Sequence, residues 1–358
     1  MKDLSKKKIG YVLSYRAPRY VRTRTIANAL RKIKDVEVYE ARNSTSGFLR
    51  YFQTLLRLIR IRIIHHPDIY ILGFRGHEIF PFVRILTYPR ALIFDAMMSP
   101  FGAMEEEGKL GKLGKLLSPV VYAFEKAILK FSDQILTDTA LHRQFFIDVF
   151  DIFPEKIVPV YVGTDEDVFV PTKKRKNSLK EGLDVFFYST SLPLHGVDFI
   201  LEAARRLQKE PIRFTIVGGN RKHHPVSELS NLIQIDWVEF EKLPEYIEKA
   251  DICLGGPFGN TKQAERVITG KTFQFLAMGK PVVIGRINEE VGFIDKRNCL
   301  FVEQGSPDSL TEALLWALQN KHQLPAIGEN GLELFRHRFS TQVIASRISE
   351  VLNQVIRV

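Results

Sequence analysis

The sequence predicts an α/β protein built from two doubly wound parallel sheets. In both halves of the chain, short apolar runs of strand length alternate with longer segments whose apolar residues recur at helical spacing. This alternation is typical of strand–helix–strand units with parallel strands. The chain has 358 residues, which is enough for two domains with a core each.

The composition is that of an ordinary globular protein with a basic surface. The chain is 45% hydrophobic and 26% charged, and its formal net charge is +10. A positive surplus favours phosphorylated small molecules, an anionic membrane or a nucleic acid as partners. No zinc-finger spacing, RNA-recognition signature or basic-zipper pattern accompanies the charge, so we expect no nucleic-acid partner.

Two features of the sequence concern the cellular compartment. No apolar run reaches the length of a membrane span, and the N-terminus, MKDLSKKKIGYVLSY, shows no signal-peptide core before its first apolar strand. Cys253 and Cys299 both lie in apolar strand-like runs, where free buried thiols are expected. We therefore expect a cytoplasmic protein. A location at the inner face of the cell membrane is also compatible with the sequence.

The chain opens as a doubly wound sheet does, with an apolar strand at 8–14 and a helix at 25–34. The loop between them, YRAPRYVRTR, lacks the glycine fingerprint of dinucleotide-binding proteins but contains four arginines, Arg16, Arg19, Arg22 and Arg24. An arginine-lined loop at the ligand-facing edge fits an acceptor phosphate, for which we single out Arg16 and Arg19. It fits a solvated surface equally well.

After a strand at 36–39, residues 48–64 predict a long amphipathic helix. One side carries apolar residues, and arginines share another, with Phe48, Leu49, Phe52, Leu55, Leu56, Ile59 and Ile63 on the first and Arg50, Arg57 and Arg60 on the second. The pattern fits a helix that lies on an anionic membrane surface. It also fits a core-facing helix with a wet basic side, and the sequence leaves both alternatives open.

Two further strands, at 69–73 and 91–94, end in polar or glycine residues, at the edge where parallel sheets bind ligands. Asp95 follows the second strand, in FDAMMSP, where it either caps the next helix or faces a ligand. The run GKLGKLGKL at 108–116 suits a mobile connector or a membrane-facing loop. A helix at 118–131, a strand at 134–137 and a helix at 140–150 complete this half.

Residues 171–182, PTKKRKNSLKEG, are charged and lack an apolar face, which predicts a linker. It would separate an N-terminal domain, 1–170, from a C-terminal domain, 183–339. The second domain again alternates strands and helices, with strands at 185–188, 213–217, 233–238 and 252–254 and helices at 197–208 and 243–249. A last helix, within 340–358, carries an apolar stripe.

The strongest functional signal lies between Asp251 and Gly285. A short buried strand leads into a loop with three glycines, whose backbone amides can approach a ligand closely. A short helix from Lys271 to Met278 follows, and Gly279 ends it. The start of a helix after such a loop favours anions.

Full charges strengthen this anion site. Arg266 and Lys271 each bring one elementary charge, whereas the helix dipole is worth about half of one. Gln274 lies three residues after Lys271, on the same helix face. We therefore predict a diphosphate held mainly by the two cations, while Gln274 bonds a neutral neighbour such as a ribose hydroxyl.

The run KTFQFLAMGKPVV in this stretch resembles the donor-site signature of the retaining GT-B glycosyltransferases of family 4. The preceding segment RVITGK resembles the R-V-I-P-N-K stretch of one subgroup, and PVYVGTDEDVF resembles the segment that closes the N-terminal domain in this family. The resemblance implies a GT-B fold, with two Rossmann-like domains facing a central cleft. It also implies that the last helix crosses back onto the first domain and that a nucleotide sugar lies over this loop and helix.

Four positions depart from the family pattern. Arg266 and Gln274 stand where two glutamates usually contact the donor sugar and the ribose, and an arginine cannot accept a hydrogen bond from the sugar. In the loop STSLPLHGVDF, Thr190 and His195 stand where an arginine and a lysine commonly grip the diphosphate. These departures make Arg266 and Lys271 more important for binding the donor.

From these residues we predict one site with two sides. The catalytic residues would be Arg266, Lys271 and Asp95, since Asp95 and Ser99 match an acceptor-facing segment, D-A-[FM]-x-S, of the subgroup. The donor-binding residues would be Thr190, His195, Gly196, Gly218, Gly219, Phe258, Gly259 and Gln274. The acceptor side would hold Arg16, Arg19 and Ser99.

The resemblance and these residues together predict a retaining, metal-independent glycosyltransferase of the hexosyltransferase type. It would move a sugar from a nucleoside diphosphate sugar to a hydroxyl of a glycan or lipid-linked acceptor, in cell-surface polysaccharide synthesis. No D-x-D pair or His/Cys cluster indicates a metal, and no cofactor is expected beside the nucleotide sugar.

The alternative is a GT-B protein that binds a nucleotide or a partner without catalysis. The missing glutamate pair supports this alternative. A GT-B epimerase is a third interpretation, but no acid–base carboxylate cluster in the second half supports it.

Overall fold

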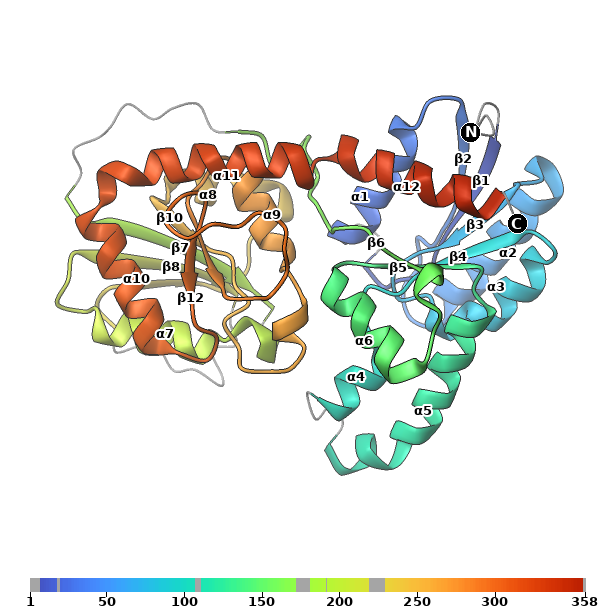
Figure 1. Cartoon of the computed structure of the whole chain (residues 1–358), viewed down its shortest axis with the longest axis horizontal. Coiled ribbons are helices and arrows are strands. Elements are labelled where there is room, and N and C mark those ends of the chain that lie inside the picture. Colours follow the sequence, from blue (N-terminus) through green and yellow to red (C-terminus); the bar gives the residue numbers. More distant parts are fainter. Residues whose placement is uncertain are drawn as a thin grey trace. The chain divides into compact units, whose positions relative to one another are not determined.

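The computed structural model of the chain describes residues 7–17, 20–106, 111–171, 181–190, 192–218 and 229–356. The chain divides into two compact units. The first consists of Met1–Gly163 with Thr341–Val358, and the second of Thr164–Ser340. Within the described residues, each unit contains one six-stranded sheet whose strands are all parallel (Figure 1). Most of the predicted linker at 171–182 lies outside the described residues.

The sheet of the first unit has the order β2-β1-β3-β4-β5-β6. Its strands are β1 (Lys7–Leu13), β2 (Val36–Arg42), β3 (Ile69–Leu72), β4 (Ala91–Asp95), β5 (Gln134–Thr137) and β6 (Ile157–Pro159). Its helices are α1 (Val21–Lys32), α2 (Leu49–His65), α3 (Phe80–Thr87), α4 (Pro100–Glu105), α5 (Gly111–Phe131), α6 (Ala140–Phe150) and α12 (Thr341–Ile356). In the strand register, Ile9 of β1 lies beside Val38 of the edge strand β2 and Ile69 of β3.

Two apolar clusters hold the first unit together. Because side chains alternate along a strand, Tyr11 and Val12 of β1 belong to different clusters. The Tyr11 cluster contains residues of α1 and α12, and the Val12 cluster contains residues of α2, α3, α5 and α6. The last helix therefore packs against α1, and Figure 1 shows the two side by side.

The sheet of the second unit has the order β12-β11-β10-β7-β8-β9. Its strands are β7 (Leu183–Ser189), β8 (Ile212–Gly218), β9 (Leu232–Ile235), β10 (Ile252–Leu254), β11 (Val282–Gly285) and β12 (Leu300–Val302). Its helices are α7 (Val197–Arg206), α8 (Leu243–Lys249), α9 (Gly270–Ala277), α10 (Pro307–Gln319) and α11 (Leu324–Arg338). Read from β9, this is the strand order of the dinucleotide-binding doubly wound fold.

Two local predictions for the first unit were wrong. Helix α1 begins at Val21, so the second half of the arginine-rich loop is helical and Arg22 is fully buried. Helix α5 begins at Gly111, so the part of the 108–116 run that the structure describes is a helix and not a connector. Leucine and lysine are strong helix formers, which outweighs the two glycines here. Residues 107–110 lie outside the described residues.

Candidate functional site

The candidate site of the second unit lies where the order of its strands reverses. After β7 the chain continues to β8 on one side, whereas after β10 it continues to β11 on the other. β7 and β10 are direct neighbours, so their carboxyl ends mark the place where doubly wound sheets bind ligands. The loops at 190–196 and 255–269 follow these two strand ends and border the site.

The two loops pack backbone against backbone. Gly259 donates its backbone N–H to the carbonyl of Leu194 at 3.0 Å, and a Cβ at Gly259 would overlap the carbonyl oxygen of Pro193. Gly196, which has a φ of +64°, lies against the backbone of Phe258. Neither position has room for a side chain, and Phe258 itself is buried.

Lys271 is the most unusual side chain of this region. It lies in the first turn of α9 and is 5% exposed. Its Nζ has no hydrogen-bond partner among the described residues and lies 4.9 Å from the ring centroid of Phe187. Burial lowers the pKa of Lys271 to about 7. A buried ammonium group without a partner costs several kcal/mol, so an anion beside this side chain would stabilise its charged form.

The charge of Lys271 acts on His195. Burial lowers the pKa of His195 well below its ordinary value, and the charge of Lys271 lowers it further. Its Nδ1 lies 2.5 Å from the hydroxyl oxygen of Ser189. If Ser189 donates this hydrogen bond, the ring proton sits on Nε2 and can be donated to a ligand oxygen. His195 is therefore neutral near pH 7 and lacks the positive charge that strengthens a hydrogen bond to a phosphate.

Gln274 is held by the end of β7. Its side-chain oxygen accepts a hydrogen bond from the hydroxyl of Tyr188, and the residue is 1% exposed. One turn earlier, Thr269 donates to the carbonyl of Gly255 at 2.6 Å and shares a hydrogen bond with Thr272 at 3.1 Å. These contacts fix the start of α9 against the glycine loop, which positions Lys271 and Gln274.

Arg266 ends a short 3₁₀ turn, Ala264–Arg266, between the glycine loop and α9. Ala264 and Val267 pack with Leu194 in a small apolar cluster, which places the turn beside the residue that precedes His195. Gln304 also donates to the carbonyl of Ala264 at 3.1 Å. The structure therefore brings the Arg266 turn to the same pair of loops as His195 and Lys271.

Two further predicted donor residues, Thr190 and Gly218, occupy the edge of the same sheet. Thr190 is exposed at the end of β7, and Gly218 ends β8 beside Ser189 in the strand register. A Cβ at Gly218 would overlap the carbonyl oxygen of Ser189, so this position has no space for a side chain. Gly219 lies outside the described residues. The roles of all these residues in binding a donor stay predictions.

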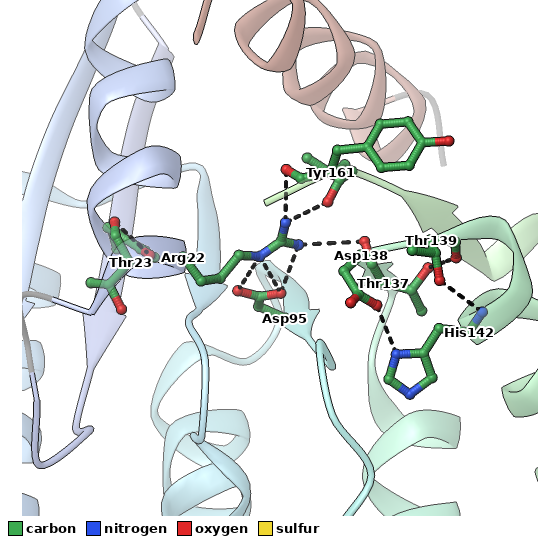
Figure 2. Close-up of polar contacts among 10 residues, drawn as sticks. Arg22, Thr23, Asp95, Thr137, Asp138, Thr139, His142 and Tyr161 are labelled. Atoms are coloured by element: carbon green, nitrogen blue, oxygen red, sulfur yellow. Dashed lines mark hydrogen bonds and ion pairs between the residues drawn. The ribbon is translucent and has the colours of Figure 1, made fainter. Parts of the chain in front are cut away.

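In the first unit, Asp95 pairs with Arg22 and has no exposed surface. The Arg22 Nη2 lies 2.9 Å from the Asp95 carboxylate, and both side chains are 0% exposed. Figure 2 shows the guanidinium between Asp95 and backbone carbonyls of the neighbouring strand ends, where it also donates to Val160, Tyr161 and Thr137. Asp95 thus positions Arg22 at the carboxyl edge of this sheet, and its catalytic role stays a prediction.

Ser99 is the N-cap of α4. Its hydroxyl accepts a hydrogen bond from the backbone N–H of Gly102 at 2.9 Å and donates to Glu125 at 3.0 Å. Glu125 also accepts from the N–H of Phe101 at 2.9 Å, and burial raises the pKa of Glu125 to about 8 despite these hydrogen bonds. The capping role that the sequence considered for Asp95 therefore belongs to Ser99, which is buried.

A second buried polar pair follows β5. The Nδ1 of His142 lies 2.7 Å from the carboxylate of Asp138, and both side chains are buried (Figure 2). Thr139 caps α6 by accepting a hydrogen bond from the backbone N–H of His142 at 3.0 Å. Of the predicted acceptor-side residues, Arg16 is exposed and Arg19 lies outside the described residues.

Sequence reasoning missed the contributions of β7 and of Arg22. Phe187 presents its ring to the Nζ of Lys271. Tyr188 donates to Gln274, and the hydroxyl of Ser189 bonds His195. Their position at the end of the first strand of a doubly wound unit was a signal for ligand proximity, but only the fold shows their partners. Arg22 gave no signal of burial, because its partner Asp95 is 73 residues away.

No three His, Cys, Asp or Glu side chains gather as a metal site within the described ranges. In the same part of the chain, no helix combines the length and the apolar character that crossing a membrane requires.

Comparisons with known proteins agree with this architecture. Residues 184–320 match the sequence model of the family described as "Glycosyl transferases group 1". The chain is 13% identical to the sucrose-phosphate synthase of Thermosynechococcus elongatus, with a TM-score of 0.73 over 98% of this chain and all of that one. It is 14% identical to Anabaena Alr3699/HepE in complex with UDP-glucose, with a TM-score of 0.68 over 97% of this chain and 99% of that one.

The chain has the GT-B fold. Among curated sequences, the chain is 27% identical over 213 residues to a protein of Bacillus subtilis. That protein is named "Putative teichuronic acid biosynthesis glycosyltransferase TuaH". That match covers 57% of this chain and 52% of TuaH. The chain thus spans about half the length of the curated relatives it matches.

Proposed function

We propose that this protein is a glycosyltransferase that moves a sugar from a nucleoside diphosphate sugar to a hydroxyl group. The observation that carries the proposal is Lys271, a buried lysine without a partner among the described residues, at the point where the strand order of a doubly wound sheet reverses. A diphosphate supplies the negative charge that compensates a buried ammonium group. The glycine loop beside it lets backbone amides approach the same phosphates.

The chemistry follows from where charge develops. As the glycosidic bond breaks, negative charge grows on the leaving diphosphate, and a preorganised cation in a water-poor site stabilises it. Lys271 and Arg266 would supply this positive charge, and neutral His195 would donate a hydrogen bond to a phosphate oxygen. Gln274, held by Tyr188, would bond the ribose through its amide N–H groups.

The matches support this reaction class. The family match falls on the unit that contains Lys271, residues 184–320, and one structural neighbour binds UDP-glucose. TuaH, a relative named for teichuronic acid biosynthesis, supports a glycan or lipid-linked acceptor in cell-surface polysaccharide synthesis. We propose further that the transfer retains configuration and needs no metal, with the leaving phosphate assisting the acceptor proton, and that the enzyme works at the inner face of the cell membrane.

The test uses purified protein and a panel of UDP-, GDP-, ADP- and dTDP-sugars. Thermal shift identifies the donor, because a ligand stabilises the native state in proportion to the logarithm of its concentration over the Kd. Turnover of that donor is then measured by slow hydrolysis and by transfer to candidate acceptors. Lys271→Ala and Arg266→Ala should each lower turnover about a hundredfold, the magnitude expected when one charge contact in the transition state is lost.

Lys209→Ala is the matched control, since it removes an exposed lysine of the same unit and should leave turnover unchanged. Near-normal turnover by the Lys271→Ala/Arg266→Ala double variant would refute the assignment.

A binding protein without catalysis is the second candidate. The observation that favours it is the engaged side-chain oxygen of Gln274, which already accepts from Tyr188 at a position where the family usually has a carboxylate. Such a protein would bind one nucleotide sugar in the thermal-shift panel and leave it intact through a long incubation with every acceptor tried.

A further inference from the structure

The outer sides of α2 and α3 are apolar. Helix α2 buries only Thr54 and Leu58, so the apolar side that the sequence predicted for it faces outward. Phe52, Leu56 and Ile63 of α2 are 63%, 62% and 65% exposed. A stripe of large apolar side chains is costly to leave in water, and patches of this kind mark interaction sites.

Helix α3 extends the same surface. Phe82 and Ile85 are 57% and 74% exposed, and α3 packs beside α2 (Figure 1). Between the two helices lies an open groove of about 300 Å³ whose lining is entirely apolar. Its walls are formed by Phe52, Leu55, Leu56, Ile59, Phe82, Ile85 and Leu86. We call this the α2–α3 surface.

The charged residues within these two helices are all basic. Helices α2 and α3 contain five arginines and no aspartate or glutamate, although Arg84 of α3 is paired with Asp133 and Glu78 is exposed just before α3. Arg60 is exposed on α2 and lies one turn from Leu56 and Ile63 of the apolar stripe. Arg57, one turn before Arg60, is exposed as well and donates to the backbone carbonyl of Arg42. Helix α5, which packs against α3, adds four lysines and one acidic residue, Glu125, which is buried. The surplus of exposed basic residues beside the apolar groove favours an occupant that is apolar and carries negative charge at its rim.

We propose that the α2–α3 surface docks on an anionic lipid bilayer, with its apolar side chains inserted among the acyl chains and Arg57 and Arg60 at the headgroups. A second copy of this chain fits poorly, because a symmetric contact would place two basic rims against each other. The inference gives the proposed membrane location a physical basis and rests on that part of the proposed function. It does not depend on the donor chemistry.

The two components of the surface contribute by different physics. Each basic residue near an anionic membrane contributes about fivefold to binding, which corresponds to ~1 kcal/mol, and this part weakens as salt is added. An inserted leucine or isoleucine contributes about tenfold or more. Tight docking therefore requires both the arginines and the exposed apolar stripe.

The experiment measures binding of the full chain to vesicles of phosphatidylcholine, with and without phosphatidylglycerol, by flotation. Wild-type protein should bind the mixed vesicles and bind pure phosphatidylcholine much more weakly. Arg57→Gln/Arg60→Gln should weaken binding to mixed vesicles about 25-fold. Leu56→Ser/Ile85→Ser should weaken it about a hundredfold, and because both side chains are exposed the variant should fold normally.

Two matched controls test whether vesicle binding depends on the α2–α3 surface or on any exposed apolar or charged side chain. Phe153→Ser removes another exposed apolar side chain of the same unit, 69% exposed, and Lys209→Gln removes an exposed charge of the other unit. Both should bind vesicles as wild type does. Lys271→Ala should also bind them normally, so that failure of the donor site and failure of the membrane surface are told apart.

Several outcomes would overturn the inference. Wild-type protein that does not float with mixed vesicles, or that binds both vesicle types equally, excludes an anionic bilayer as the occupant. Equal losses in Phe153→Ser and Leu56→Ser/Ile85→Ser would show that the α2–α3 surface has no special role. A dimer in sedimentation equilibrium that Leu56→Ser/Ile85→Ser abolishes, without vesicle binding, would assign the surface to a second copy.

Discussion

We expect donor binding to be coupled to the uptake of a proton by Lys271. In the ligand-free protein, burial lowers the pKa of Lys271 to about 7, so about half of the molecules carry a neutral lysine at neutral pH. A nucleotide-sugar diphosphate prefers the ammonium form and raises the pKa when it binds. Binding must therefore weaken as the pH rises above 7, because each molecule then has to take up a proton first.

The size of the effect follows from the pKa. A group with a pKa of about 7 is roughly three-quarters protonated at pH 6.5 and about 3% protonated at pH 8.5. The Kd for the donor should therefore rise about 25-fold between these pH values, or ~1.9 kcal/mol. The phosphates of a nucleotide sugar are diesters that stay ionised throughout this range. His195 should add no slope, since its pKa lies well below the ordinary value.

Isothermal titration calorimetry measures both parts of the prediction. The Kd is followed from pH 6.5 to 8.5, and titration in two buffers of different ionisation enthalpy should report uptake of about one proton per donor near pH 8. Lys271→Met, which keeps the apolar stem over Phe187, should bind weakly at every pH and lose the slope. A pH-independent Kd in wild type, or an equal slope in Lys271→Met, would refute the role given to this lysine.

Three further predictions concern the framework around the site. Arg22→Met should lower the free energy of unfolding by about 3–5 kcal/mol in urea titrations, because it leaves the buried Asp95 carboxylate unpaired; a loss below ~1 kcal/mol would contradict the pairing. The pKa of Glu125, about 8 in the fold, exceeds its unfolded value, so its contribution to stability is complete below about pH 4.5 and is lost as the pH rises through 8. The free energy of unfolding of Glu125→Gln minus that of wild type should therefore be more positive at pH 8 than at pH 5. If this difference is the same at both pH values, Glu125 does not titrate as described. Gly259→Ala should push the loop away from Pro193 and weaken donor binding about tenfold, whereas an unchanged Kd would show that the loop yields.

Much of the fold could be predicted from local patterns. The alternation of apolar runs located β1–β5 and β7–β10 to within a few residues, because a buried parallel strand needs an apolar run and its crossover helix needs an apolar stripe. The same patterns failed where local preference was ambiguous. The arginine-rich segment before residue 25 was predicted as a loop but is helical from Val21, and the pairing of Arg22 with Asp95 offsets the cost of burying its charge.

The candidate site shows the same division. Lys271, Arg266 and Gln274 could be selected from spacing, because they follow a glycine loop at the end of a strand. Spacing said nothing about Phe187, Tyr188 or Ser189, which belong to a strand far away in the sequence. Contacts of that kind depend on strand order, which one sequence does not reveal.

By itself, the sequence determined two doubly wound sheets, the loops at their carboxyl ends and the positive net charge of the chain. Only the tertiary structure decided that Lys271 is buried without a partner among the described residues, that Asp95 holds Arg22, and that α2 turns its apolar side outward. The physical reason is that periodicity and propensity are properties of neighbouring residues. Burial, pairing and pKa instead depend on which distant segments pack together.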